Sequence, residues 1–299
     1  MQKTSVYLPE RLKRALTLRA GLTGRSEADL LRAAVEAEVA KSPTGTDHFP
    51  DPAIPGRLVG IGVGPGDPDL LTMRAVHALR RADRVVAPAT AIDAVGRAEA
   101  IVRQAVPGLP VERLAFAMDP SRAARDRSIA AAADAVVGYL EAGEEVAFLT
   151  LGDPLTYSTF SSLSAAVRDR RPATAVEAVP GIMAFQALAA RTGTVIADEH
   201  TRFTVRTALD GEDLAADLAD PEVTLVIYKG GRRLPELAAA AKRAGREGSA
   251  VGGELLGMPG ERIGALSDLA AHGPASYLAT VIVPAVAPLV APSRLRPKR

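Results

Sequence analysis

From Arg57 onward, short apolar runs alternate with longer amphipathic runs, and this alternation restricts the chain to a layered α/β architecture. The apolar runs predict strands at 58–63, 83–87, 146–151, 175–179, 203–207, 223–228, 249–252 and 277–283. The amphipathic runs predict helices at 69–81, 123–142, 155–169, 182–192 and 232–244. This stretch is long for one open sheet, so we expect two lobes that meet near "AVPGIMAF".

Composition excludes several function classes. A hydrophobic fraction of 47% can fill a sizeable core, and a net charge of +1 does not indicate a globally basic or acidic partner. The chain has no cysteine, which excludes disulfides, thiolate nucleophiles and iron–sulfur clusters. Its four histidines lack ligand spacing, so we expect no metal site; they are His48, His77, His200 and His272. Without a long apolar segment or an apolar leader core, we expect a cytoplasmic protein with no membrane span.

The first predicted strand lies in "LVGIGVGPGDPDLLT", where glycine occupies every second position. Side chains alternate faces along a strand, so the valines and isoleucine between the glycines face the core. The bare face is formed by Gly60, Gly62 and Gly64. Glycine inside a strand is costly, which indicates close approach of a ligand or of another element. Tight packing of the sheet on a helix is the alternative.

Two predicted strands end in the same tripeptide, Gly-Asp-Pro. In the first, Asp67 suits a helix N-cap, with Pro68 at the first helical position and Asp69 complementing the helix dipole. In the second, "EVAFLTLGDPLTYST", Gly152 and Asp153 follow the strand, and we expect Asp153-Pro154 to open the next helix. Loops at strand ends are where open α/β sheets bind ligands. Carboxylates favour an ammonium, a sulfonium or ribose hydroxyls over a phosphate, and S-adenosylmethionine has all three.

Residues 1–43 form a separate small unit. We expect a strand from Gln2 to Leu8, a helix from Pro9, a break at 23–25, and a second helix that Ser26 caps with Asp29 as capping-box partner. Such a unit cannot bury a core alone, so it needs a partner. Residues 44–56, "TGTDHFPDPAIPG", are rich in proline and polar residues and are typical of a linker.

The stretches "KTSVYLPERLKRAL" and "TGRSEADLLRAAV" resemble the ribbon-helix-helix family. The resemblance implies a homodimer in which two strands from two chains pair and enter the DNA major groove. The residues that it places toward the bases are Lys3, Ser5 and Tyr7. Residues 1–42 carry eight Lys/Arg against five Asp/Glu, a modest excess. A dimerisation unit that never contacts DNA is the alternative.

The larger part of the chain resembles the tetrapyrrole methylase family over about residues 57–285. The resemblance is carried by "GVGPGDPDLLT", "LTLGDPLTYST", "VPGIMAF", "LVIYKGG", "GMPGERI" and "SYLATVIVP". It implies α/β lobes at 57–179 and 180–290 with an active-site cleft between them, and S-adenosylmethionine as methyl donor. Residues 291–299 would form a basic tail. The combination of "FLTLGDPLTYST", "LAFAMD" and "GMPGERI" is most similar to precorrin-2 C20-methyltransferases of cobalamin synthesis.

The resemblance also implies which residues contact the donor. They are Pro65 in the first loop; Leu151, Gly152 and Asp153 in the second, with Thr156 behind; Met183 and Ala184 in the second lobe; and then Lys229, Leu256 and Ala279. Lys229 departs from the methionine of many relatives. His200 and Arg202 stand where a more acidic stretch is expected, and this departure concerns the substrate more than the donor.

Methyl transfer to an electron-rich ring carbon needs alignment more than a catalytic group, and the sequence assigns no general base. A tetrapyrrole carries carboxylates, so candidate clamps are the arginines Arg202, Arg206, Arg232 and Arg233, if they are not simply solvated. Two alternatives stay open. The chain could be a methylase of this fold with another substrate, at a different tetrapyrrole carbon or on a peptide backbone. It could also be a ribbon-helix-helix regulator whose methylase-like body senses donor or corrinoid, or combine both functions.

Overall fold

The computed structural model describes residues 10–41, 56–117, 121–199, 201–208 and 214–286. The chain divides into two compact units, residues 1–49 and residues 50–299. The two units are described separately.

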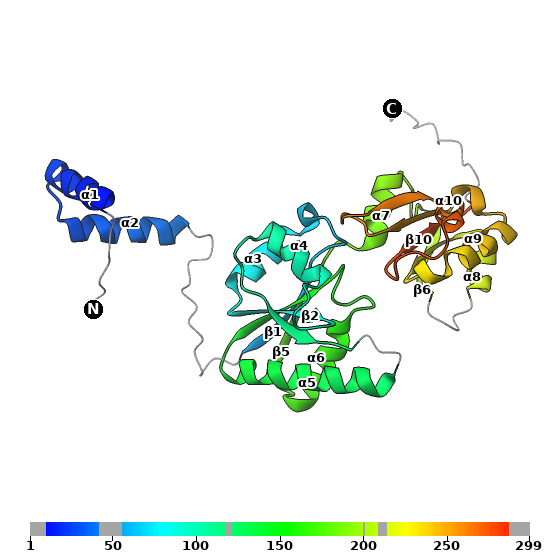
Figure 1. The fold of residues 1–299 in the computed structure, drawn as a ribbon, viewed down its shortest axis with the longest axis horizontal. Coiled ribbons are helices and arrows are strands. Elements are labelled where there is room, and N and C mark those ends of the chain that lie inside the picture. The colour runs from blue at the N-terminus through cyan, green and yellow to red at the C-terminus, as the bar shows by residue number, and fades with distance from the viewer. Residues whose placement is uncertain (1–9, 42–55, 118–120, 200, 209–213, 287–299) are drawn as a thin grey trace, which may run out of the picture. The chain divides into compact units, whose positions relative to one another are not determined.

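The described part of the first unit is a pair of helices, α1 (Glu10–Thr23) and α2 (Glu27–Lys41) (Figure 1). Ser26 Oγ accepts a hydrogen bond from Asp29 N at 3.1 Å and donates to the Asp29 carboxylate at 2.7 Å, as the predicted cap requires. Thr17 Oγ1 donates to Glu27 at 2.6 Å and links the two helices. The predicted strand, with Lys3, Ser5 and Tyr7, lies outside the described residues, as do residues 42–55.

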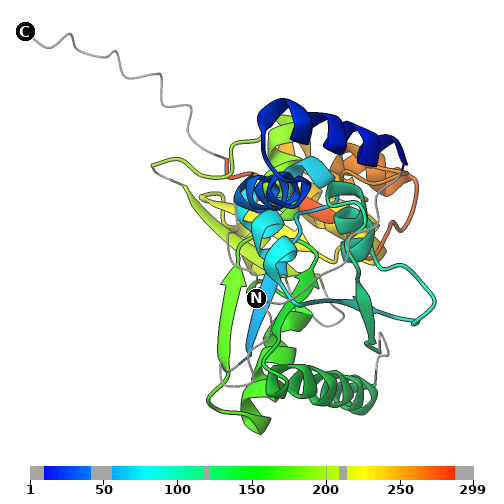
Figure 2. The same cartoon turned by 90° about the vertical axis from the view of Figure 1, so that its left-hand side faces the viewer.

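The second unit begins with a parallel five-stranded sheet. Its strands are β1 (Arg57–Gly62), β2 (Arg84–Ala89), β3 (Glu112–Ala115), β4 (Glu145–Thr150) and β5 (Ala175–Val179), in the order β3-β2-β4-β1-β5. In both views β1 and β5 lie side by side (Figures 1 and 2). The helices α3 (Met73–Arg81) and α4 (Arg97–Ala105) cover one face. The helices α5 (Arg122–Glu141) and α6 (Thr159–Arg170) cover the other.

A second, mixed sheet forms the other lobe. Its strands are β6 (Arg202–Thr207), β7 (Val223–Tyr228), β8 (Val251–Glu254), β9 (Arg262–Ala265) and β10 (Thr280–Val283), in the order β6-β7-β10-β8-β9. Its helices are α7 (Ala184–Thr192), α8 (Ala215–Ala219), α9 (Leu234–Arg243) and α10 (Leu266–Ala271). Helix α7 packs on one face, and the other three pack on the opposite face. The predicted two-lobed α/β class is confirmed.

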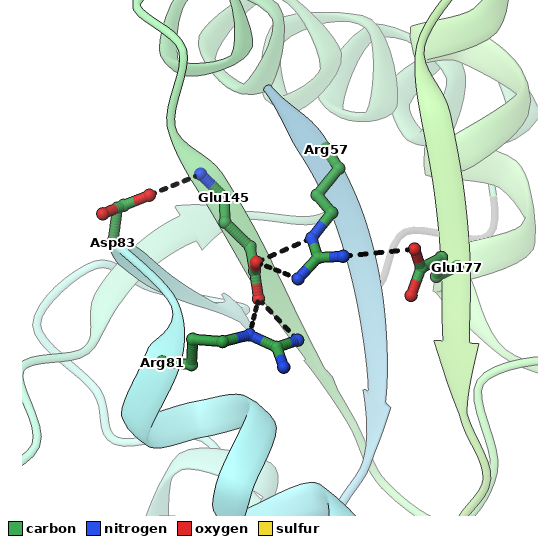
Figure 3. Close-up of polar contacts among 5 residues, drawn as sticks. All are labelled: Arg57, Arg81, Asp83, Glu145 and Glu177. Atoms are coloured by element: carbon green, nitrogen blue, oxygen red, sulfur yellow. Dashed lines mark hydrogen bonds and ion pairs between the residues drawn. The ribbon is translucent and has the colours of Figure 1, made fainter. Parts of the chain in front are cut away.

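An ion-pair network fixes the register at the amino ends of the parallel strands (Figure 3). Arg57 begins β1 and lies opposite Glu145, the first residue of β4. The Glu145 carboxylate, only 5% exposed, accepts from Arg57 Nε at 2.6 Å and from Arg81 Nη2 at 3.2 Å. Arg57 also reaches Glu177 at 3.3 Å, and the Asp83 carboxylate accepts from Glu145 N at 2.8 Å. This end of the sheet is therefore structural, which leaves the carboxyl ends for a ligand.

The glycines of β1 serve packing rather than a ligand. A Cβ at Gly60 would lie 2.5 Å from the Phe160 ring of α6. A Cβ at Gly62 would lie 2.5 Å from the backbone N of Gly181, in the loop after β5. The expected close approach of another element is thus confirmed at these two positions, and the interpretation that a ligand occupies the bare face is wrong there, because neighbouring elements already fill the space.

Both Asp-Pro steps begin a tight turn rather than an α-helix. Asp67 caps the short 3-10 helix η1 (Pro68–Leu70), and α3 begins afterwards with Thr72 as its N-cap. Helix α6 begins at Thr159 with Ser158 as its cap, four residues later than predicted. The helices α4, α8 and α10 and the strands β3 and β9 were not predicted; the two strands are only four residues long.

Candidate functional site

The loops that follow β1 and β4 meet at the carboxyl edge of the parallel sheet. Gly152 N donates to Gly64 O at 2.7 Å, and Val63 N donates to Thr150 O at 2.9 Å. Gly64 and Gly152 have φ values of +78° and +71°, in the left-handed region that glycine adopts without strain. The two Gly-Asp-Pro loops therefore converge, as the parallel arrangement of their strands predicts.

The Asp153 carboxylate holds two chain segments together. One oxygen accepts from Leu155 N at 2.9 Å and lies 3.4 Å from the Thr156 hydroxyl. The other accepts from Gly181 N at 3.2 Å, in the loop after β5. Asp67 has a purely local role, because its carboxylate accepts from Asp69 N at 2.9 Å. Both aspartates are loop-forming residues, and Asp153 also ties the end of β4 to the end of β5, across β1.

The first loop fits closely against the second lobe. A Cβ at Gly66 would lie 1.9 Å from the carbonyl oxygen of Leu256, and a Cβ at Gly257 would lie 2.3 Å from Asp67 N. Glycine is required at both positions because the backbones touch. The Tyr157 hydroxyl also crosses between the lobes and donates to Val205 O in β6 at 2.8 Å.

A cavity opens where these loops meet the second lobe. Its lining residues are Pro65, Arg97, Leu151, Gly152, Asp153, Thr156, Tyr157, Met183, Ala184, Tyr228, Lys229, Leu255, Leu256, Met258, Leu278 and Thr280. Nine of the ten residues expected from the family resemblance line it. The tenth, Ala279, is buried between two lining residues, and its carbonyl accepts from Gly230 N at 3.2 Å.

Sequence reasoning missed seven of the lining residues. Tyr157, Tyr228, Leu278 and Thr280 directly adjoin expected residues, and Leu255 adjoins Leu256, so their positions in the chain could have indicated them. Met258 lies within the quoted motif "GMPGERI". Arg97 carried no such signal, because it begins a helix that the sequence did not predict.

Three residues lining the cavity have strained backbones. Tyr157, Lys229 and Leu255 have φ values of +48°, +59° and +51°, and no other non-glycine residue in the described ranges has a positive φ. Such conformations cost about 1–3 kcal/mol each and persist where the surroundings impose them. Their restriction to one cavity marks it as the functional part of the fold.

Tyr228 is suited to packing and hydrogen bonding rather than to proton transfer. Burial raises the pKa of its phenol above the ordinary value, so the group stays protonated at physiological pH. Its ring meets the Tyr157 ring edge-on, with centroids 6.1 Å apart. The lining contains no histidine or glutamate, and its one carboxylate, Asp153, is held by backbone N–H groups. The cavity is therefore built to orient a ligand.

Thr280 places a free hydroxyl in the buried wall of the cavity. The residue is fully buried, and its Oγ1 has no hydrogen-bond partner within the described structure. An unsatisfied buried hydroxyl costs about 1–3 kcal/mol, so it is a natural point for a polar ligand atom.

The four arginines suggested as carboxylate clamps do not line the cavity. Arg202 pairs with Asp220 at 3.0 Å, Arg206 pairs with Asp217 at 3.3 Å, and Arg233 pairs with Glu236 at 2.8 Å. Arg232 lies exposed on the short helix η2 (Gly231–Arg233). His200 lies outside the described residues.

The described ranges contain no cluster of His, Asp or Glu side chains that could hold a metal ion. Within the same ranges, every helix is too short or too polar to span a bilayer.

Two α/β lobes with a cavity where they meet are the architecture of a two-lobed α/β enzyme. The chain belongs to the Tetrapyrrole (Corrin/Porphyrin) Methylases, whose family model matches residues 57–270. Members of this family methylate tetrapyrroles with S-adenosylmethionine as donor, and the chain is accordingly an S-adenosylmethionine-dependent tetrapyrrole methyltransferase.

Sequence relatives agree with this assignment, and solved structures share the fold. The precorrin-2 C(20)-methyltransferase of a Sinorhizobium species is 35% identical and covers 77% of this chain and 95% of its own length. The cobalt-precorrin-2 C(20)-methyltransferase of Salmonella typhimurium is 30% identical, and the match covers 76% of this chain and 96% of that relative. The fold is similar to a cobalt precorrin-4 methyltransferase structure, with a TM-score of 0.59, 22% identity and coverages of 80% and 99%. It is also similar to the uroporphyrin-III C-methyl transferase from Thermus thermophilus complexed with S-adenyl homocysteine, with a TM-score of 0.52, 23% identity and coverages of 76% and 97%.

Proposed function

We propose that this chain transfers a methyl group from S-adenosylmethionine to C20 of precorrin-2, a reaction of cobalamin biosynthesis. The observation that carries the proposal is the convergence of the two Gly-Asp-Pro loops on one cavity, joined by the bond between Gly152 N and Gly64 O. The choice of precorrin-2 is supported by the 35% identity to a precorrin-2 C(20)-methyltransferase over nearly its whole length.

The residues present fit the methyl donor. Leu151, Met183 and Leu256 give the cavity an apolar wall, and the unpartnered Thr280 hydroxyl offers a hydrogen bond. The remaining residues that would hold the donor are Pro65, Gly152, Asp153, Thr156, Ala184, Ala279 and, through its backbone, Lys229. When bound, S-adenosylmethionine supplies a methyl group on a sulfonium, which an electron-rich carbon can attack directly.

The protein's contribution is orientation and exclusion of water. The loops after β1 and β4 are fixed to one another and to Gly181, so they hold ligands in one geometry. Alignment of reactants in this way lowers the activation free energy by up to about 7–11 kcal/mol in model systems. The Tyr228 phenol stays protonated, and the Asp153 carboxylate is engaged with backbone N–H groups, so we assign no general base to the chain.

Incubation with precorrin-2 and a donor carrying a ¹³C methyl group tests the proposal. We expect the product to gain one labelled methyl group, with the carbon signal at C20. Parallel reactions contain uroporphyrinogen III, other precorrins or a peptide. Label in one of these alone would support the alternative of another substrate, and label at another carbon of precorrin-2 would refute the C20 assignment.

We also propose that the first unit forms a homodimer. None of its side chains with described exposure is buried, and Leu12 and Leu18 are 52% and 67% exposed. A helix pair without a core of its own needs an apolar partner surface, and a second copy of the ribbon-helix-helix-like segment would supply one. Light scattering of the full chain at micromolar concentration should give a dimer mass. A monomer would contradict the assignment.

DNA binding by this unit stays a prediction from the family resemblance, with Lys3, Ser5 and Tyr7 as the residues that face the bases. Specific retention of a DNA sequence at physiological salt, lost in the double variant Lys3→Ala and Tyr7→Ala, would support a regulator or a bifunctional protein. Retention without sequence preference would count against it. Three further expectations also stay predictions from the sequence: the domain boundaries at residues 43, 56, 179 and 290, the basic tail at 291–299, and the cytoplasmic location.

A further inference from the structure

Two cationic side chains line the cavity, and they come from different lobes. Arg97 is the first residue of α4 in the first lobe, and Lys229 directly follows β7 in the second. No other lysine, arginine or histidine in the described structure lines this cavity. The wall therefore presents positive charge from both sides to whatever occupies the space.

Arg97 is exposed and carries an unneutralised charge at the fixed start of α4. Its guanidinium makes no hydrogen bond or ion pair with the described part of the chain. The first turn of α4 is fixed by Glu99, which is fully buried and accepts from Arg113 Nε at 2.6 Å. Arg113 also donates to Ile92 O at 2.9 Å and so anchors the segment that leads into the helix. An arginine at a fixed helix start, with no ion-pair partner in the described ranges, is available to a ligand.

The charge of Lys229 is likewise available. Its Nζ lies 5.9 Å from the centroid of the Tyr277 ring, and no carboxylate in the described ranges pairs with it. The one carboxylate of the lining, Asp153, is occupied by Leu155 N and Gly181 N. The cavity thus has two cations and no free anion of its own, which favours an anionic ligand.

We propose that the Arg97 guanidinium and the Lys229 ammonium bind carboxylate groups of the tetrapyrrole, gripping its acidic side chains from the two lobes. This inference rests on the proposed function and adds the groups that recognise the substrate. Arginine suits bidentate binding of a carboxylate, and lysine acts as a point charge on a flexible stem. The donor carries a carboxylate as well, so the experiment separates the two sources.

The variants Arg97→Gln and Lys229→Met, alone and combined, test the proposal in the full chain. Both substitutions keep most of the side-chain length, and Lys229→Met leaves the strained backbone with a side chain of similar shape. Arg232→Gln is the matched control, because Arg232 is exposed like Arg97 but lies outside the cavity. We expect each single variant to raise the KM for precorrin-2 about tenfold with little change in kcat, as for lost uniform binding. The ionic-strength dependence of KM should weaken in the variants and not in the control.

Calorimetry with S-adenosylhomocysteine forms the second arm. An unchanged dissociation constant in both variants supports binding of the substrate's carboxylates. An unchanged KM, or a loss of S-adenosylhomocysteine affinity that parallels the rise in KM, would overturn the inference.

A third arm keeps the inference testable if the wild-type chain methylates no tetrapyrrole and the proposed function fails. Uroporphyrin, a tetrapyrrole with many carboxylates, is then titrated into the protein, and its binding is followed by fluorescence. Weaker binding by the two variants than by the control supports the clamp, and equal binding refutes it.

Discussion

Gly152 N donates a hydrogen bond of 2.7 Å to Gly64 O and thereby joins the loops that follow β1 and β4. The two glycines are far apart in sequence, yet both adopt a positive φ and end strands that are neighbours in one parallel sheet. This contact and the hydrogen bond from Gly181 N to Asp153 join the loops that follow β1, β4 and β5 into one surface, called here the loop platform. The donor site that we propose depends on this loop platform.

Replacing Asp153 with alanine should weaken S-adenosylhomocysteine binding about tenfold while the protein stays folded, because Gly181 N and Leu155 N lose their acceptor. Calorimetry and thermal unfolding measure the two effects. Asp169→Ala, at an exposed position of α6, is the control and should change neither. An unaltered affinity in Asp153→Ala would remove this residue from the site.

Thr280→Val should raise the thermal stability of the ligand-free protein and lower its affinity for S-adenosylhomocysteine several-fold. The reason is that the Thr280 hydroxyl is buried without a partner until a ligand supplies one. Thr224→Val is the matched contrast, since Thr224 is equally buried but its hydroxyl accepts from Ala285 N at 3.0 Å. That variant should lose about 1 kcal/mol of stability and keep its affinity. Destabilisation by Thr280→Val with intact binding would contradict the assignment.

Gly66→Ala should disturb the junction of the lobes, because the added Cβ would lie 1.9 Å from the Leu256 carbonyl oxygen. We expect a lower melting temperature and weaker S-adenosylhomocysteine binding. Gly138→Ala, in the interior of α5 with open space around it, should instead stabilise the protein by about 0.5–1 kcal/mol. Equal effects of the two substitutions would mean that the close contact between the lobes is absent in solution.

The buried Glu99 makes stability depend on pH in the acid range. Hydrogen bonds from Arg113, and then from Arg103, hold the pKa of the Glu99 carboxyl below its ordinary value. A lowered pKa stabilises the fold above that ordinary value, and the contribution is lost as the pH falls through the folded-state pKa. Glu99→Gln should therefore cost about 3 kcal/mol at neutral pH, and the difference from wild type should shrink as the pH falls below the ordinary glutamate pKa of 4.5. Urea unfolding at several pH values checks this, and a constant difference would contradict it.

The sequence predicted the parts of the site that depend on the backbone of the parallel sheet. Strands that run in parallel bring their ends to one edge, so the convergence of the loops at Gly64 and Gly152 followed from the pattern. The role of Gly60 did not follow, because a bare strand face looks the same whether a ring such as Phe160 or a ligand fills it. Asp153 was predicted to open a helix, but its second oxygen bonds Gly181 N across the sheet, which is a tertiary contact without a local signal.

Arg97 was beyond sequence reasoning for a related reason. Helix α4 is nine residues long and buries Glu99, a charged residue that a pattern of apolar positions places on the surface. Only the pairing of Glu99 with Arg113, a residue of β3, explains that burial. The cation in the cavity thus depends on a contact between two elements, of which neither was predicted.

Amide chemical shifts during titration with S-adenosylhomocysteine test the central claim most directly, namely that the joined loops after β1 and β4 hold the methyl donor. The account predicts that the largest shifts fall at residues 151–156 and 183–184. It also predicts that Arg57 and Glu145, at the opposite end of the same strands, stay unchanged. Shifts centred on that opposite end, or no saturable shifts at all, would contradict it.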